Sequence, residues 1–231
     1  MAAKKSDPAA DVNCVVVQRA KQGSKVCPNF AHYGAGHHFQ AKTNSCRISG
    51  FLAHVLALLL LTPRTREVFM TTLERCLEFL DRNHVCYAHT KHSLAFTALE
   101  VAFAEHISPH KLAKTVVYAS AQGYGLAVLP ADCLVDLSML GNFVNDPFVR
   151  LASERELAEL FPECELGAMP PVGILFHLPA IVDSSVASQE FIAFNAGTHR
   201  DVIHMYYADF SRLTNPAVAS FALTAVEEPI V

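Results

Sequence analysis

The stretch Leu112-Ala113-Lys114-Thr115-Val116-Val117-Tyr118 is the segment from which the fold prediction starts. Its β-branched and apolar residues predict a strand from Ala113 to Tyr118. A turn-like segment with two glycines, 119–125, separates it from the apolar run Leu126–Leu129. The two runs are therefore predicted to form a β-hairpin. A lysine inside an apolar strand needs a partner, solvent or a functional role, which makes Lys114 the first candidate site residue.

Capping boxes, in which Ser or Thr is followed three residues later by Glu, predict where three helices begin. The boxes start at Thr71, Thr97 and Ser153, and the helices are expected to end near Asn83, near His106 and before Pro162. Shorter helices are predicted for Asp132–Leu140 and Asp209–Leu213, and further strands for Ala180–Val182, Phe191–Ala196 and Val202–Tyr207. This order predicts an α/β fold of the α+β type, a single domain with a mixed β-sheet covered by helices.

The composition and net charge of the chain argue against several classes of function. The chain has 231 residues, 52% of them hydrophobic, which is enough for one well-buried domain. A net charge of −4 argues against extended contact with DNA or long RNA. The apolar run Phe51–Leu61 is too short to span a bilayer. We expect a cytoplasmic protein with no DNA and no membrane partner.

The character of the sequence changes near Met70. Residues 1–69 mix Lys, Gly, Asn, Ser and clustered His without a clear period, whereas helix and strand signals agree with one another from there on. We therefore expect residues 70–231 to form the domain. Residues 1–69 are expected to be an N-terminal extension that is poorly ordered or not part of the native protein.

Several motifs of other enzyme classes are absent from the sequence. It contains no H-E-x-x-H, C-x-x-C, P-loop, G-x-G-x-x-G or G-x-S-x-G pattern. His106 and His110 are four residues apart, but Pro109 prevents them from sharing one helical face. No metal site and no cofactor are predicted.

Two further segments are candidates for chemistry. The loop Gly167–Gly173 contains two prolines between glycines, and rigid loops of this kind often carry function. The amides of Gly167, Ala168 and Met169 could act as hydrogen-bond donors there. His199 follows Gly197 in a turn between two strands and could line the mouth of a pocket. Each candidate also has a purely structural interpretation. The loop could be an ordinary connection, His199 could make only local hydrogen bonds in its turn, and Lys114 could lie on the exposed face of its strand.

Six segments, in their order along the chain, resemble the YbaK/prolyl-tRNA-synthetase-associated domain family. They are Ala113–Val117, Leu126–Ala131, Glu156–Pro162, Gly167–Gly173, Leu178–Asp183 and Phe194–His199. The resemblance covers Thr71–Pro216 and implies an α/β fold with a mixed, strongly curved sheet. It also implies aminoacyl-tRNA deacylation, the hydrolysis of the ester that joins a wrong amino acid to tRNA, in trans or within prolyl-tRNA synthetase.

The resemblance assigns roles to individual residues. The family's strand lysine corresponds to Lys114, its G-x-x-x-P loop to Gly167 and Pro171, and its late glycine turn to Gly197 and His199. The implied partners are the acceptor end of a mischarged tRNA and an aminoacyl-tRNA synthetase. Because alanine-specific members have Asn in place of Thr115, the amino acid removed is not predicted.

An aminoacyl ester is already activated, so a positioned water supplies most of the catalysis. The catalytic groups expected from this resemblance are Lys114 and the amides of Gly167, Ala168 and Met169, which would stabilise an oxyanion. The expected substrate-binding residues are Thr115, Pro171, Gly197, His199, Lys111 and Arg200. With no obvious general base, the ribose hydroxyl of the substrate is expected to activate the water.

Two other classes of function remain open from the sequence. The same residues could form a non-catalytic module that binds aminoacyl-adenosine, a nucleotide or a synthetase. They could also hydrolyse a small ester or a cysteinyl metabolite without tRNA. Turnover of mischarged tRNA would distinguish the aminoacyl-tRNA deacylase from both of these classes.

Overall fold

The computed structural model describes residues 70–224. Their largest sheet has five strands in the order β5-β2-β3-β6-β9. The strands are β5 (Arg150–Leu151), β2 (Ala113–Ser120), β3 (Gly123–Pro130), β6 (Ala180–Asp183) and β9 (Ala217–Ala219). Pairs β5–β2 and β2–β3 are antiparallel, whereas β3–β6 and β6–β9 are parallel. The predicted mixed sheet is confirmed. The predicted extension, residues 1–69, and the apolar run within it lie outside the described residues.

The predicted hairpin forms, but its turn is tighter than expected. The pairing of β2 with β3 runs from Ala113–Pro130 to Ser120–Gly123, so the predicted turn 119–125 is mostly strand. Gly123 adopts φ +115°, which closes the turn. Gly125 lies inside β3, and a side chain there would collide with the ring of Tyr118. That glycine serves close packing within a strand rather than a turn.

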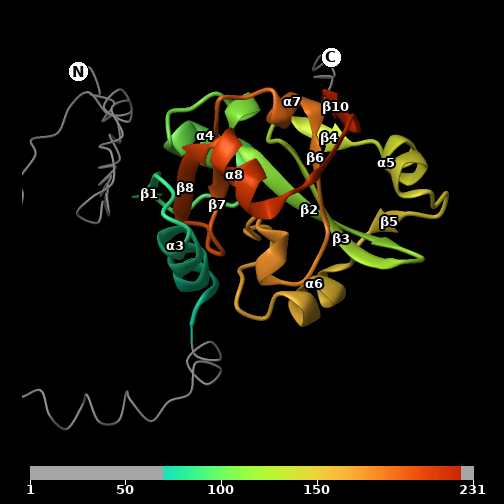
Figure 1. Cartoon of the computed structure of the whole chain (residues 1–231), viewed down its shortest axis with the longest axis horizontal. Helices are drawn as coiled ribbons and strands as arrows, with labels where there is room; N and C mark the ends of the chain where they lie inside the picture. The colour runs from blue at the N-terminus through green and yellow to red at the C-terminus, as the bar shows by residue number, and fades with distance from the viewer. Residues whose placement is uncertain (1–69, 225–231) are drawn as a thin grey trace, which may run out of the picture.

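A second, antiparallel sheet has the order β1-β8-β7. Its strands are β1 (Tyr87–Lys91), β8 (Asp201–Tyr206) and β7 (Phe191–Asn195). A parallel bridge between Leu112 and Ala193 joins it to the start of β2. Figure 1 shows the hairpin at the centre of the domain, with this sheet on one side and β5 and α5 on the other. Strand β1 was not predicted, because its sequence YAHTK is short and largely polar.

The three capping boxes are confirmed. Thr71, Thr97 and Ser153 each accept a hydrogen bond from the N3 amide, and the N3 glutamate bonds back to the cap. The helices are α3 (Thr72–Arg82), α4 (Ala98–Ala104), α5 (Leu137–Val144), α6 (Glu154–Leu160), α7 (Ser184–Ala187) and α8 (Tyr207–Thr214). Short 3-10 helices are η2 (Pro109–Lys111) and η3 (Gly173–Leu175). None of the helices within residues 70–224 is long and apolar enough to cross a membrane.

The predicted helix Asp132–Leu140 is wrong in its first half. Residues Cys133–Val135 form strand β4, which pairs with β10 (Ala222–Thr224) in a two-stranded sheet. The helix starts only after Asp136, whose carboxylate accepts from the amides of Ser138 and Met139. A pairing partner far along the chain thus overrides the local preference.

Helices cover the sheets through apolar faces. Cys76 and Leu80 of α3 and Phe210 of α8 pack with Phe194 and Ile203 of the smaller sheet. Helix α5 packs Leu140 against the face of the hairpin that carries Ala127 and Leu129. Helix α6 places partly buried leucines against Leu126, on the opposite face. Burial of these apolar faces is the main driving force that holds the layers together.

Asp183 connects the end of β6 to the C-terminal segment. It is 3% exposed, and its carboxylate accepts from the amides of Ser185, Phe221 and Ala222 at 2.9, 2.7 and 2.8 Å. Burial raises the pKa of this carboxyl, but the N–H donors outweigh it, and the net pKa is lowered.

We predict that Asp183→Asn lowers the free energy of unfolding by about 2 kcal/mol or more, because one carboxylate oxygen becomes an NH2 group, which cannot accept from the backbone amides that face it. Urea unfolding midpoints at unchanged slope measure this. Asp209→Asn, at an exposed ion pair with Arg212, should change stability by less than about 0.5 kcal/mol.

Since the pKa of Asp183 is lowered on folding, its stabilisation is complete above the unfolded value of about 3.9 and is lost as the pH falls through the folded-state pKa. The difference between wild type and Asp183→Asn should therefore shrink only below about pH 4. Equal stability of the two proteins at pH 7 would contradict the role of the carboxylate.

Candidate functional site

Two segments that lie apart in sequence are joined by their backbones at one end of the sheets. The amide of Glu165 donates to the carbonyl of Gly197 at 2.9 Å, and the amide of Gly197 donates to the carbonyl of Ala168 at 2.9 Å. The Glu165 carboxylate also accepts from the amide of His199. These bonds place the Gly167–Gly173 loop directly beside the turn that follows β7.

The pairing of the two segments brings His199 against Gly167. Gly167 has φ +90°, and a Cβ there would lie 3.6 Å from Cε1 of His199. His199 is 8% exposed, and the centroid of its ring lies 5.2 Å from that of Phe96. Its Nδ1 has no hydrogen-bond partner among residues 70–224. A buried, unpartnered ring nitrogen beside a glycine loop is a group that can bind a ligand.

The loop amides differ in their availability. The amide of Ala168 donates to the carbonyl of Glu165 at 2.9 Å, in a turn. The amides of Gly167 and Met169 have no acceptor among the described residues. Met169 is 5% exposed and packs with Val117 and Leu126 of the hairpin, which fixes the loop on the sheet. Of the three expected donors, Gly167 and Met169 therefore remain for a substrate.

Thr115 lies on the face of β2 that this loop covers. Its neighbours at two residues' distance, Ala113 and Val117, pack in the clusters that contain Val172 and Met169 respectively. Thr115 is 8% exposed, and its hydroxyl has no partner among the residues that the structure describes. Pro171, also buried, belongs to the same loop.

The Lys114 side chain leaves the opposite face of β2. Its amine donates to the carbonyl of Ala131 at 3.2 Å. Burial lowers the pKa of this amine, while the nearby Cys133 and Asp132 act in the opposite direction. Counting two residues from the Leu112–Ala193 bridge places Asn195 on the same face as Lys114. The structure therefore separates the lysine from the loop by the thickness of the strand.

Sequence reasoning missed two polar groups near these residues. The side-chain oxygen of Asn195 and Nε2 of His92 are buried without a partner within residues 70–224. Asn195 sits immediately before the Gly197 turn, and the amide of His92 donates to the carbonyl of Arg200 at 2.9 Å. Neither has a motif in sequence, because the pairing of β7 with β8 and the bond from His92 to Arg200 set their positions.

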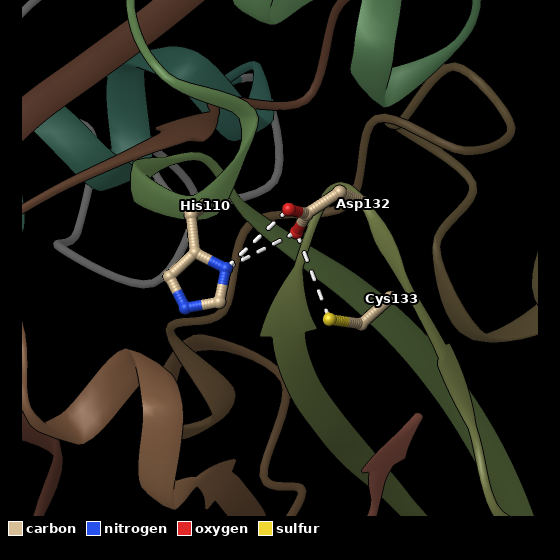
Figure 2. A group of neighbouring side chains, drawn as sticks. All are labelled: His110, Asp132 and Cys133. Atoms are coloured by element: carbon tan, nitrogen blue, oxygen red, sulfur yellow. Dashed lines mark hydrogen bonds and ion pairs between the residues drawn. The ribbon is translucent and has the colours of Figure 1, made fainter. Parts of the chain in front are cut away.

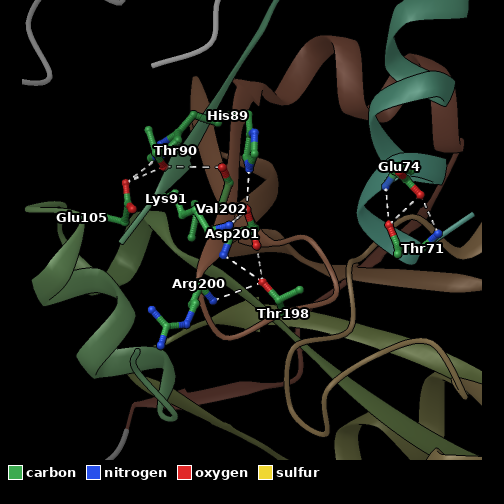
Figure 3. Close-up of polar contacts among 11 residues, drawn as sticks. Thr71, Glu74, His89, Thr90, Lys91, Glu105, Thr198, Arg200, Asp201 and Val202 are labelled. Carbon is green, nitrogen blue, oxygen red and sulfur yellow. Dashed lines mark hydrogen bonds and ion pairs between the residues drawn. The ribbon is translucent and has the colours of Figure 1, made fainter. Parts of the chain in front are cut away.

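The turn that carries His199 and Arg200 is fixed by its own side chains (Figure 3). The Thr198 hydroxyl accepts from the amides of Arg200 and Asp201 at 3.2 and 3.0 Å and donates to the Asp201 carboxylate. His89 of β1 bonds the other oxygen of that carboxylate at 2.8 Å. Arg200 itself is exposed, as is Lys111 in η2, so both cations can reach a ligand from solvent.

The fold thus carries a glycine–proline loop that packs on the β2–β3 hairpin and is bonded to the turn after β7. The family model "Aminoacyl-tRNA editing domain" matches residues 92–213, more than half of the chain. The chain belongs to this family.

Curated relatives agree with the family. The Multifunctional Ser/Thr-tRNA deacylase ProXp-y of Escherichia coli K12 is 35% identical over 101 residues, which are 43% of this chain and 60% of the relative. The protein of that name from Escherichia coli O157:H7 matches equally. The chain thus spans about 60% of the length of the curated relatives that it matches.

The similar solved structures support only the fold, because their sequences are only 20% to 23% identical to this chain. A putative trans-editing enzyme for prolyl tRNA synthetase has a TM-score of 0.58 at 23% identity and covers 71% of this chain and 99% of its own. The hypothetical protein APE2540 has a TM-score of 0.60 at 20% identity and covers 65% of this chain and all of its own.

We predict that Gly197→Ala destabilises the domain by about 2 kcal/mol or more. Its φ is +97°, and a Cβ would lie 2.7 Å from Cβ of Thr72, at the start of α3. Thermal and urea unfolding of the purified variants measure the loss.

The matched control is Gly123→Ala, which also has a positive φ but no atom within 4 Å of the added Cβ. Only backbone strain remains there, so the loss should be about 1 kcal/mol. Equal losses at the two positions would show that the contact with Thr72 contributes nothing.

Proposed function

We propose that this chain is an aminoacyl-tRNA deacylase that hydrolyses mischarged tRNA in trans. The observation that carries the proposal is the Gly167–Gly173 loop joined to the His199 turn, within a domain of the editing family. The reaction adds water to the ester carbonyl, breaks the bond from the carbonyl carbon to the ribose oxygen, and releases the amino acid and intact tRNA. It would take place in the cytoplasm, with a synthetase as a further partner.

The free amides support an oxyanion site. The carbonyl oxygen of the ester gains negative charge as water adds, and preorganised N–H donors stabilise that charge. The amides of Gly167 and Met169 are the donors in this proposal, because the amide of Ala168 is engaged with Glu165. The ribose hydroxyl next to the ester activates the water, so the chemistry uses no metal and no cofactor.

The cations serve the nucleic acid in this proposal. Lys114 would hold the phosphate of the terminal adenosine or steady developing charge from the face opposite the loop. Lys111 and Arg200, both exposed, would contact the backbone of the single-stranded acceptor end. Few cations suffice for a short single strand, which is consistent with the net charge of −4.

The amino-acid side chain would lie near Thr115, Pro171, Gly197 and His199. Thr115 brings a buried hydroxyl with no partner within the described residues, and the His199 Nδ1 is likewise unpartnered. A site with unpaired polar atoms favours a ligand that hydrogen-bonds to them and rejects one that does not. We therefore propose seryl or threonyl esters as substrates, the class in the name of the Escherichia coli relative.

We predict that Lys114→Met lowers the rate of deacylation by about 100-fold or more, because it removes the charge but keeps the length of the side chain. Release of labelled amino acid from a panel of Ser-, Thr-, Ala- and Cys-tRNA measures it. Lys91→Met, at a lysine whose side chain is 58% exposed, is the control and should retain the wild-type rate.

Full activity of a folded Lys114→Met protein would remove the lysine from the mechanism. If the folded wild type bound the mischarged tRNAs but hydrolysed none of them, the non-catalytic binding module would replace the deacylase.

Thr115→Val should lower kcat/KM for Ser- and Thr-tRNA by about 10-fold while leaving Ala-tRNA within about 2-fold, since valine keeps the shape and removes the hydroxyl. The ratio of the two rates is the informative quantity, because a general loss of fold would lower both. A parallel fall for all substrates would contradict hydroxyl recognition by Thr115.

A further inference from the structure

Three metal-ligating side chains from two parts of the chain meet outside the joined loops. His110 comes from η2, and Asp132 and Cys133 come from the segment that follows β3. Figure 2 shows the imidazole and the thiol both directed at the carboxylate. Nδ1 of His110 lies 3.4 Å from a carboxylate oxygen of Asp132, and Sγ of Cys133 lies 3.6 Å from one. All three ligand atoms lie within 4.8 Å of one another.

The backbone holds these residues in register. The amide of Ala131 donates to the carbonyls of Pro109 and Leu112, at 3.2 and 2.9 Å, which ties η2 to the end of β3. Cys133 is 4% exposed and is a free thiol in strand β4. The cluster is therefore carried by fixed elements, as a preorganised metal site requires.

The order of the three groups argues against a catalytic triad. A nucleophilic cysteine needs the imidazole next to the thiol, with the carboxylate behind the imidazole. Here the carboxylate lies between the imidazole and the thiol, so His110 does not take the thiol proton. The arrangement instead presents one nitrogen, one oxygen and one sulfur to a common point.

The separations match tetrahedral zinc. With ordinary zinc–ligand bond lengths, a tetrahedral site has edges of about 3.4 Å between nitrogen and oxygen and about 3.6 Å between sulfur and oxygen. The nitrogen–oxygen and sulfur–oxygen distances in the protein, both to Oδ1 of Asp132, are 3.4 and 3.6 Å. Only the nitrogen–sulfur edge, within 4.8 Å, has to shorten, and the exposed His110 side chain can rotate to do so.

We propose that His110, Asp132 and Cys133 form a zinc-binding site with three protein ligands and an open fourth position. Imidazole and thiolate together favour zinc over magnesium or calcium, which prefer oxygen ligands. Lys114 donates to the carbonyl of Ala131, next to these ligands, so a bound dication would lie close to its amine. The proposal of this site does not depend on the deacylation proposed above.

The test titrates zinc into the full-length reduced chain against a chromophoric chelator. The wild type should bind one equivalent more than Cys133→Ser or His110→Ala. Cys164→Ser is the matched control, because Cys164 is also a free thiol but lies by Thr72, and it should bind as the wild type does. Comparing equivalents isolates this site from any histidines and cysteines elsewhere in the chain.

Cobalt(II) gives a second readout. Thiolate ligation produces a sulfur-to-cobalt charge-transfer band, and the component assigned to this site should be absent in Cys133→Ser and present in Cys164→Ser. If Cys133→Ser failed to fold, His110→Ala would still decide the question, since its side chain is 45% exposed. The same number of equivalents and the same affinity in wild type and His110→Ala would overturn the proposal.

Discussion

The antiparallel pairing of β2 with β3 is the interaction on which the rest of the structure depends. Strand β5 adds to the outer edge of β2, β6 adds to β3, and the smaller sheet joins at Leu112. Most residues of both strands are buried, on both faces, so each face has to be covered by a separate layer. The hairpin thereby fixes where the helices pack and where the loops that follow β3, β6 and β7 can meet.

The candidate site is a consequence of that arrangement. The loop at Gly167–Gly173 and the turn at Gly197 have backbone conformations that glycine adopts with little strain, with φ of +90° at Gly167 and +97° at Gly197. Reciprocal backbone bonds then lock the two segments together. Two amides, an imidazole nitrogen and a threonine hydroxyl are left there without a partner among residues 70–224. Buried polar groups without partners are rare in proteins, and their concentration here is the basis of the proposed binding site.

Local patterns in the sequence predicted correctly those features that depend on interactions between residues close together in the chain. Capping boxes at Thr71, Thr97 and Ser153 were confirmed because the cap and its partner lie three residues apart. Prediction was wrong at Cys133–Val135, because the strand there exists only through its pairing with Ala222–Thr224. The predicted turn of the hairpin was too long for a similar reason. Gly125 falls within the predicted turn, but it is a strand residue whose missing side chain makes room for the ring of Tyr118, and no local pattern indicates that contact.

The sequence by itself determined the fold class, the hairpin, the main helices and the types of residue in the two candidate loops. Periodicity and capping act over a few residues and can be read directly from the chain. Only the tertiary structure decided which amides stay free, which face of β2 the Gly167–Gly173 loop covers, and that His199 lies against Gly167. It also brought His110 to Asp132 and Cys133. These juxtapositions depend on how distant segments pack, and no spacing along the chain encodes them.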